Sequence, residues 1–190
     1  MNKTTSIEEL YQLFIQCGQK ITTDTRKLEA GSIFFALKGE NFDANTFAEK
    51  SIEGGCSYAI VDNPDVIRSE YILLVENVLE TFQQLAKFHR KQLTFPIIGS
   101  TGSNGKTTVT QMLASILDAH AGQASLATIG NLNNDIGVPL TLLRLNEDHK
   151  IAVVELGMNH PGEIAYLANI AKPTVALVNN AQREHLEFMV

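Results

Sequence analysis

The sequence contains no tryptophan and only two cysteines in its 190 residues. Cys17 and Cys56 do not have the spacing of a metal site, and they do not indicate a disulfide framework. Such sparing use of cysteine fits a reducing compartment, so we expect a cytoplasmic protein.

The sequence also lacks a long apolar run and an excess of basic residues. No run is long enough to cross a bilayer. The 15 Lys and Arg residues face 21 Asp and Glu residues, which gives a net charge of −6. This balance argues against general nucleic-acid or membrane-surface binding, although one local loop can still bind a nucleotide. We therefore expect no nucleic-acid partner and no membrane insertion. Separately, we expect a monomer.

The most informative stretch is a glycine-rich loop, IIGSTGSNGKTT, at residues 97–108. An apolar run leads into the loop and a helical pattern follows it, which is the context of a phosphate-binding loop. The strict motif has glycine where this chain has Ser100, whereas its later Gly-Lys-Thr core is intact. The alternative is a Gly/Ser turn that caps an ordinary helix, but it gives Lys106 and Thr107 no role. We assign the nucleotide phosphates to Gly102, Ser103, Asn104, Gly105, Lys106, Thr107 and Thr108.

The pattern around this loop predicts an α/β protein with two domains. Residues 1–76 indicate a small α/β domain without a phosphate loop, and residues 77–190 a second domain. Alternating strands and helices in the second domain favour a mainly parallel sheet covered on both faces. We predict helices at 6–18, 47–52, from 77, at 109–117, from 139 and from 161, strands at 21–26, 32–37, 58–61, 71–75, 95–99, 125–129, 151–154 and 175–178, and a polar loop at 39–45.

Ligands of parallel sheets lie at the carboxyl ends of the strands. Glu155 follows the strand at 151–154, and His185 comes after the strand at 175–178. A carboxylate beside a phosphate loop can hold Mg²⁺. Asn133 and Asn134 are either turn residues or substrate contacts, and the residues do not separate these interpretations. His89 lies on the apolar stripe of its helix, which favours packing over catalysis.

Four segments are similar to one enzyme family. Residues 101–108 resemble the ATP loop of the Mur ligases, which form the amide bonds of the bacterial cell-wall precursor. Residues 130–143 and 155–164 resemble the members that add D-alanyl-D-alanine to UDP-N-acetylmuramoyl-tripeptide. Asp24-Thr25-Arg26 is similar to the Asp-Ser-Arg element that holds the uridine end of that substrate.

This resemblance implies an ATP- and Mg²⁺-dependent ligase that proceeds through an acyl phosphate. It implies catalytic roles for Lys106, Glu155 and His185, and metal binding by Thr107, Glu155 and His185. The substrate contacts that it implies are Thr25, Arg26, Asn133 and Asn134. One departure is Asp43-Ala44-Asn45, which stands where Asp-Gly-His is common.

The family extends beyond the length of this chain, with more of the ATPase domain and a third domain. The resemblance therefore implies an N-terminal fragment with an incomplete P-loop ATPase domain and little or no ligase activity of its own. The alternatives to this function are a third-residue-adding Mur ligase, a folylpolyglutamate-synthetase-like enzyme, and a nucleotide-binding module that forms no covalent bond.

Overall fold

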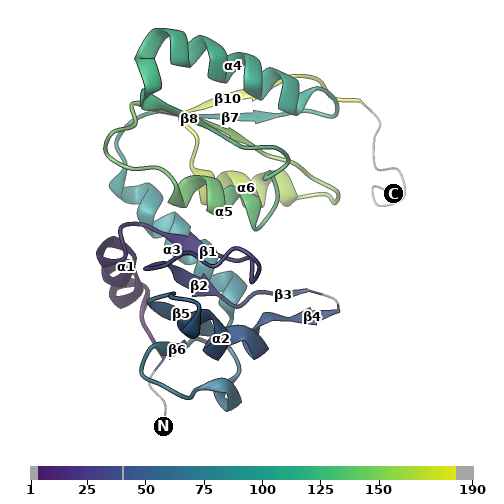
Figure 1. Cartoon of the computed structure of the whole chain (residues 1–190). Coiled ribbons are helices and arrows are strands. Elements are labelled where there is room, and N and C mark those ends of the chain that lie inside the picture. The colour runs from purple at the N-terminus through teal and green to yellow at the C-terminus, as the bar shows by residue number, and fades with distance from the viewer. Residues whose placement is uncertain (1–3, 40, 183–190) are drawn as a thin grey trace. The chain divides into compact units, whose positions relative to one another are not determined.

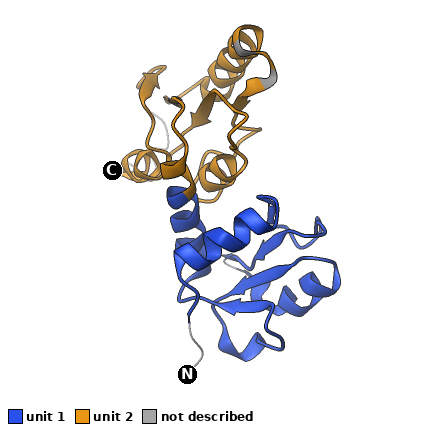
Figure 2. Cartoon of the chain, turned by 90° about the vertical axis from the view of Figure 1, so that its left-hand side faces the viewer, with its two compact units in different colours: residues 1–88 blue, residues 89–190 orange. Residues whose placement is uncertain are grey.

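The computed structural model describes residues 4–39 and 41–182 and divides the chain into two compact units (Figure 2). Unit 1 comprises residues 1–88 and unit 2 residues 89–190. Helix α3 (Val78–Gln92) lies across this division. The predicted domain boundary, between residues 76 and 77, corresponds to the beginning of the same helix.

Unit 1 is built on a parallel sheet of four strands in the order β1-β2-β5-β6. The strands are β1 (Ile21–Thr22), β2 (Ile33–Phe35), β5 (Tyr58–Val61) and β6 (Ile72–Leu74). Each strand except β5 is shorter than the sequence pattern predicts, and β1 ends four residues early. After Thr22 the chain turns, because the Thr22 hydroxyl donates to Lys27 O at 3.0 Å and Asp24 accepts from Arg26 N at 3.0 Å.

Helix α1 (Ile7–Gln16) begins where the sequence predicts it. The Ser6 hydroxyl accepts from Glu9 N at 3.2 Å, and the Glu9 carboxylate accepts from Ser6 N at 3.0 Å. This reciprocal pair satisfies two amide groups that the first turn of a helix leaves without intrahelical partners. Leu10 and Phe14, one turn apart, are fully buried on the inner face of the helix.

The predicted polar loop at residues 39–45 is wrong. This segment contains an antiparallel pair, β3 (Lys38–Gly39) and β4 (Phe42–Asp43), and then a 3₁₀ helix at Ala44–Phe47. Helix α2 (Ala48–Glu53) follows directly. A second short 3₁₀ helix, Pro64–Val66, lies between β5 and β6.

Unit 2 is a parallel sheet with helices on both faces, which confirms the predicted fold class. The strand order is β10-β7-β9-β8, all parallel. Figure 1 shows α4 on one face of the sheet and α5 and α6 on the other. The strands are β7 (Ile97–Thr101), β8 (Ser125–Ala127), β9 (Ile151–Glu155) and β10 (Val175–Val178), and the helices are α4 (Lys106–Ala121), a 3₁₀ turn at Gly122–Ala124, α5 (Gly137–Leu143) and α6 (Glu163–Ala171).

Two helices of unit 2 begin at residues other than the prolines that the pattern favoured. Helix α5 begins two residues before Pro139, because the Asn134 side chain accepts from Gly137 N at 2.8 Å. Helix α6 begins two residues after Pro161, at Glu163, whose carboxylate accepts from Asn159 N at 2.6 Å. The Asn134 oxygen thus satisfies an amide in the first turn of α5, whereas Glu163 bonds to amides of the segment that precedes α6.

The last turn of α3 holds the helices of unit 2 by two buried side chains. His89 Nε2 and Leu145 O, which follows α5, are 2.7 Å apart. The Arg90 guanidinium donates to Ala171 O at 3.0 Å and Lys172 O at 3.2 Å, at the end of α6. The packing role predicted for His89 is thereby confirmed.

Candidate functional site

The candidate site of unit 2 lies where β7 and β9 end side by side. Ser100 on β7 is the register partner of Glu155 on β9. The loop that follows β7, residues 102–105, therefore lies next to the last residue of β9. The sequence placed these segments at one sheet edge, and the structure brings them together.

The loop adopts a backbone that two glycines make possible. Gly102 has φ +149° and Gly105, just before α4, has φ +75°. A Cβ added to Gly102 would lie 3.1 Å from Asn179 Cβ and 3.1 Å from Asn180 N. Because backbone approaches this closely and φ is positive, a side chain at residue 102 would be both crowded and strained. The loop therefore has no side chain at residues 102 and 105, and it leads into the N-terminal end of a 16-residue helix, where anions are favoured.

Residues after β10 hold the loop in place. Asn179 Nδ2 and Asn180 Nδ2 donate to Asn104 O at 2.8 and 2.9 Å, and Asn180 Oδ1 accepts from Asn104 N at 3.0 Å. The Ser103 hydroxyl donates to Gln182 O at 2.9 Å. The two asparagines directly follow the strand predicted at 175–178, but the sequence indicates no role for them. The signal available was two amide side chains directly after an apolar strand.

Lys106 folds back over the same loop. Its Nζ donates to Gly102 O at 2.7 Å and to Ser103 O at 2.9 Å. The ammonium group therefore lies against the glycine-rich turn, and the residue Lys106 as a whole is half-buried. A cation held by loop carbonyls can be attracted to phosphate oxygens that bind in the turn.

Glu155 is a fully buried carboxylate with one oxygen engaged. Its Oε1 accepts from Asn133 Nδ2 at 2.7 Å and from the Thr107 hydroxyl at 3.3 Å. Among the described residues its Oε2 has no hydrogen-bond partner. A buried carboxylate oxygen without a partner is costly, and a cation would relieve that cost. Carboxylate and hydroxyl oxygens are also the donors that Mg²⁺ prefers, so this pair fits the predicted metal.

The side chains of Asn133 and Asn134, in the 130–137 loop, make different contacts. Asn133 contacts Glu155, and its carbonyl oxygen accepts from Gly157 N at 2.8 Å. The Asn134 side-chain oxygen instead accepts from Gly137 N at the start of α5. Asn133 is thus part of the site and Asn134 begins a helix. The substrate contacts predicted for both residues stay predictions.

These side chains surround one pocket of ≈ 310 Å³. It is lined by Ser103, Asn104, Gly105, Lys106, Thr107, Thr108, Asn133 and Glu155. Of the predicted site residues of unit 2, His185 lies outside the described residues. Within residues 4–39 and 41–182 no three His, Cys, Asp or Glu side chains gather as a metal-binding group.

The predicted substrate residues of unit 1 follow the carboxyl end of β1. Arg26 Nε and Nη2 donate to the two oxygens of Asp24, both at 2.9 Å. This bidentate pair lowers the pKa of Asp24 to about 2. Thr25 stands between them at the turn, and the Arg26 side chain is 84% exposed. The arrangement presents a guanidinium at the sheet edge where ligands of parallel sheets bind.

Asn45, in the segment that departs from the family pattern, is fully buried. Its Nδ2 donates to Asp43 Oδ1 at 2.7 Å and Asp62 Oδ1 at 2.9 Å. Its Oδ1 accepts from Asp62 N at 3.0 Å. Asn45 therefore ties the end of the β3–β4 pair to the end of β5.

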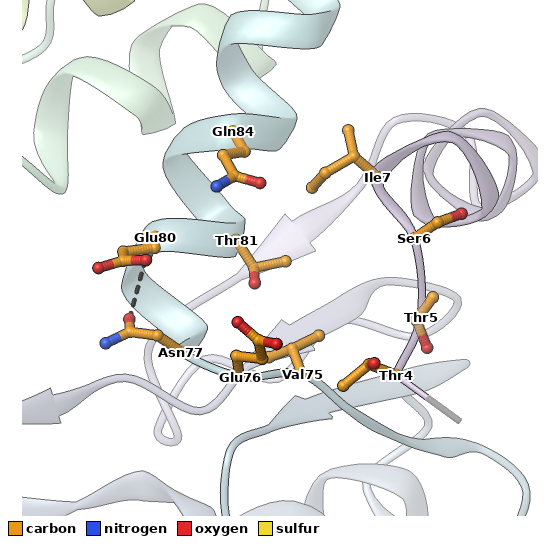
Figure 3. Close-up of a pocket in the computed structure, with 10 residues that line it drawn as sticks. All are labelled: Thr4, Thr5, Ser6, Ile7, Val75, Glu76, Asn77, Glu80, Thr81 and Gln84. Atoms are coloured by element: carbon orange, nitrogen blue, oxygen red, sulfur yellow. Dashed lines mark hydrogen bonds between the residues drawn. The ribbon is translucent and has the colours of Figure 1, made fainter. Parts of the chain in front are cut away.

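A second polar pocket, which the sequence did not indicate, lies in unit 1 between the beginnings of α1 and α3 (Figure 3). It measures ≈ 330 Å³, and Glu76 and Glu80 line it. Asn77 Oδ1 accepts from Glu80 N at 2.9 Å beside it. Among the described residues that line it, none is Lys, Arg or His, so the pocket does not suit a phosphate.

The part of the chain that the structure describes contains no helix that is both long and apolar enough to cross a membrane.

Comparison with known proteins gives consistent similarities. Residues 101–190 match the family described as Mur ligase middle domain. The UDP-N-acetylmuramoyl-tripeptide–D-alanyl-D-alanine ligase of Escherichia coli (strain K12) is 48% identical over 168 residues, which cover 88% of this chain and 36% of that protein. The enzyme of the same name from Haemophilus influenzae is 46% identical over 171 residues, which cover 89% of this chain and 37% of that protein.

Two solved structures extend the comparison. A crystal structure of MurF from Acinetobacter baumannii has a TM-score of 0.82 and 41% identity, and the match covers 94% of this chain and 42% of that one. A structure of MurF ligase from Thermotoga maritima in complex with ADP has a TM-score of 0.76 and 30% identity, and the match covers 86% of this chain and 38% of that one. The chain thus spans little more than a third of the length of its curated relatives.

Proposed function

This chain belongs to the Mur ligase family through its middle domain at residues 101–190, and from that premise we propose that it supplies the nucleotide-binding part of a D-alanyl-D-alanine-adding ligase. The relatives from Escherichia coli and Haemophilus influenzae have the name of that enzyme, and their matches cover most of this chain. The observation that carries the proposal is one pocket lined by Lys106, Thr107 and Glu155 at the end of a glycine-rich loop.

ATP is the proposed nucleotide, with its phosphates in the loop from Gly102 to Thr108. The Thermotoga maritima structure was obtained with ADP, which supports an adenine nucleotide at this site. Backbone amides of the loop and the N-terminal end of α4 would bind the phosphates, and Lys106 would neutralise the outer ones. Because Lys106 is anchored on two loop carbonyls, its charge is positioned before the nucleotide binds.

Mg²⁺ is the proposed metal, held by Thr107 and Glu155. When bound, it supplies positive charge that offsets the charge of the phosphoryl group being transferred. Asn133 donates to Glu155 Oε1 and thereby orients the carboxylate. The third metal ligand proposed from the sequence, His185, lies outside the described residues.

The acceptor of the phosphoryl group is proposed to be the terminal carboxylate of UDP-N-acetylmuramoyl-tripeptide. An unactivated carboxylate is a poor acyl donor, so conversion to an acyl phosphate allows the amine of D-alanyl-D-alanine to attack. Residues 1–76 would bind the uridine end through Thr25 and Arg26, and residues 77–190 would bind the nucleotide. The protein's contribution is positioning and charge neutralisation. We expect a cytoplasmic, monomeric protein.

The test is phosphate release by the product of the complete reading frame, with ATP, the UDP-linked tripeptide or D-alanyl-D-alanine omitted in turn. Release that needs all three supports the proposal. Release that needs a UDP-linked dipeptide and a free amino acid would indicate the third-residue-adding ligase. Release that needs a folate and free glutamate would indicate a folylpolyglutamate synthetase. ATP binding without substrate-dependent release would indicate a nucleotide-binding module. Lys106→Met is the control for release by a contaminating phosphatase.

The 190-residue chain is assayed in parallel. We expect it to bind ADP and to form little or no ligation product. Product at the rate of the complete reading frame would contradict that expectation.

A further inference from the structure

Ser100 occupies the position at which the strict phosphate-loop motif has glycine, and it is fully buried. Its hydroxyl is one of three buried side-chain oxygens that have no hydrogen-bond partner among the described residues. The other two are Glu155 Oε2 and Thr110 Oγ1. A buried oxygen that nothing satisfies destabilises the folded state, so three in one unit require a physical reason.

Ser100 and Glu155 point to the same face of the sheet. They are register partners on neighbouring parallel strands, and laterally paired residues share a face. Leu156 N donates to Ser100 O at 2.8 Å, which fixes the two strand ends against each other.

That shared face is the one covered by α4. A Cβ on the preceding residue, Gly99, would meet Pro173 at 3.1 Å on the opposite face. Glu155 accepts from Thr107, which is on α4. The Ser100 side chain therefore lies between the sheet and the first turns of α4, laterally next to the carboxylate.

The chemistry of the two groups is complementary. An ionised carboxylate only accepts hydrogen bonds, whereas a serine hydroxyl can rotate to donate one. Asn133 and Thr107 already engage Oε1, so Oε2 is the oxygen left to accept. A glycine in place of Ser100 would offer no donor at all.

We propose that Ser100 is a positioning residue for Glu155. The two groups are not bonded to each other in the described structure; a rotation of the Ser100 side chain would bring its hydroxyl to Oε2, and the bond so formed would restrain the rotation that turns Oε1 away from Thr107 and Asn133. The consequence is a carboxylate held ready for the divalent cation beside Thr107. This inference rests on the proposed nucleotide and metal site, and Ser100 itself is not among the residues that line the pocket.

The test measures the Mg²⁺ dependence of ADP binding by isothermal titration calorimetry, with the product of the complete reading frame. We expect Ser100→Ala and Ser100→Gly to raise the Mg²⁺ concentration for half-maximal enhancement of ADP binding at least fivefold. ADP binding in EDTA should stay within twofold of the unsubstituted protein, because the loop and Lys106 are unchanged. Ser100→Thr, which keeps the hydroxyl, should restore the original Mg²⁺ requirement.

Thr110→Val is the matched control, because it removes another buried hydroxyl without a partner from the α4 side. It should leave the Mg²⁺ requirement within twofold. An unchanged requirement in Ser100→Ala, an equal loss of ADP binding in EDTA, or the same change in Thr110→Val would overturn the inference. If the unsubstituted protein binds no ADP, or binds it without regard to Mg²⁺, the proposed function itself fails.

Discussion

Replacing Arg90 with methionine tests how unit 2 is held together. Arg90 is 7% exposed, and its guanidinium donates three hydrogen bonds to backbone carbonyls. Two go to Ala171 O and Lys172 O at the end of α6, and the third goes to Leu93 O at 2.8 Å. Methionine keeps most of the apolar stem and removes only the charged donor.

The magnitude follows from these bonds and from the burial that opposes them. Hydrogen bonds from a charged group contribute roughly 1.5–3 kcal/mol each, and a cation at a helix C-terminus adds up to about 1 kcal/mol. Burial lowers the pKa of Arg90, which shows that the charge is also partly desolvated at a cost. We expect a net loss of about 3 kcal/mol in the free energy of unfolding, which corresponds to roughly 6–12 °C in Tm.

The assay is urea unfolding of the chain followed by far-ultraviolet circular dichroism, since the protein has no tryptophan. Lys91→Met is the control, because Lys91 is the next residue of the same helix and is exposed. It should change the free energy of unfolding by no more than about 0.5 kcal/mol. A loss below about 1 kcal/mol in Arg90→Met would refute the reasoning, because the three carbonyls would then be satisfied equally well without the guanidinium.

Three further predictions concern the loop and the helix junction. Lys106→Met should weaken ADP binding about 100-fold, since it removes charge-assisted bonds worth about 3 kcal/mol, while the urea midpoint changes little. Gly102→Ala should cost about 1–3 kcal/mol in stability and weaken ADP binding, because its Cβ would lie 3.1 Å from Asn180 N. Gly130→Ala is the control: nothing lies within 4 Å of its added Cβ, so ADP binding should be unchanged. An equal loss of ADP affinity in both variants would contradict this prediction. Burial lowers the pKa of His89 below 6.5. As the pH falls below 6.5, the unfolded chain takes up a proton at His89 that the folded chain does not. The free energy of unfolding should therefore decrease between pH 6.5 and the lower pKa of the folded state, and His89→Gln should flatten that part of the plot of urea midpoint against pH.

Local pattern was enough for several elements and for part of the site. The capping box at Ser6 and Glu9 predicted the start of α1, and the strands at 58–61 and 175–178 have their predicted bounds. The glycine-rich loop between a strand and a helix was visible directly in the sequence. Because parallel strands end at one edge, the position of Glu155 beside Lys106 and Thr107 also followed from the order of elements.

Other features depended on contacts that no local pattern contains. The β3–β4 pair arises from a polar stretch without alternating apolar residues, so the periodicity predicted only a loop. Asn133 and Asn134 are adjacent and chemically identical, yet only Asn133 reaches Glu155.

What the sequence by itself determined is the set of residues whose role depends on near neighbours: the capped start of α1, the apolar strands and the glycines of the loop. What only the tertiary structure decided is which distant groups meet. Asn180 contacts Asn104 across 76 residues, and Arg90 bonds to Lys172 across 82. The physical reason is that periodicity encodes which face of an element is buried, whereas a hydrogen bond between distant residues depends on the register and orientation that the packed elements reach together.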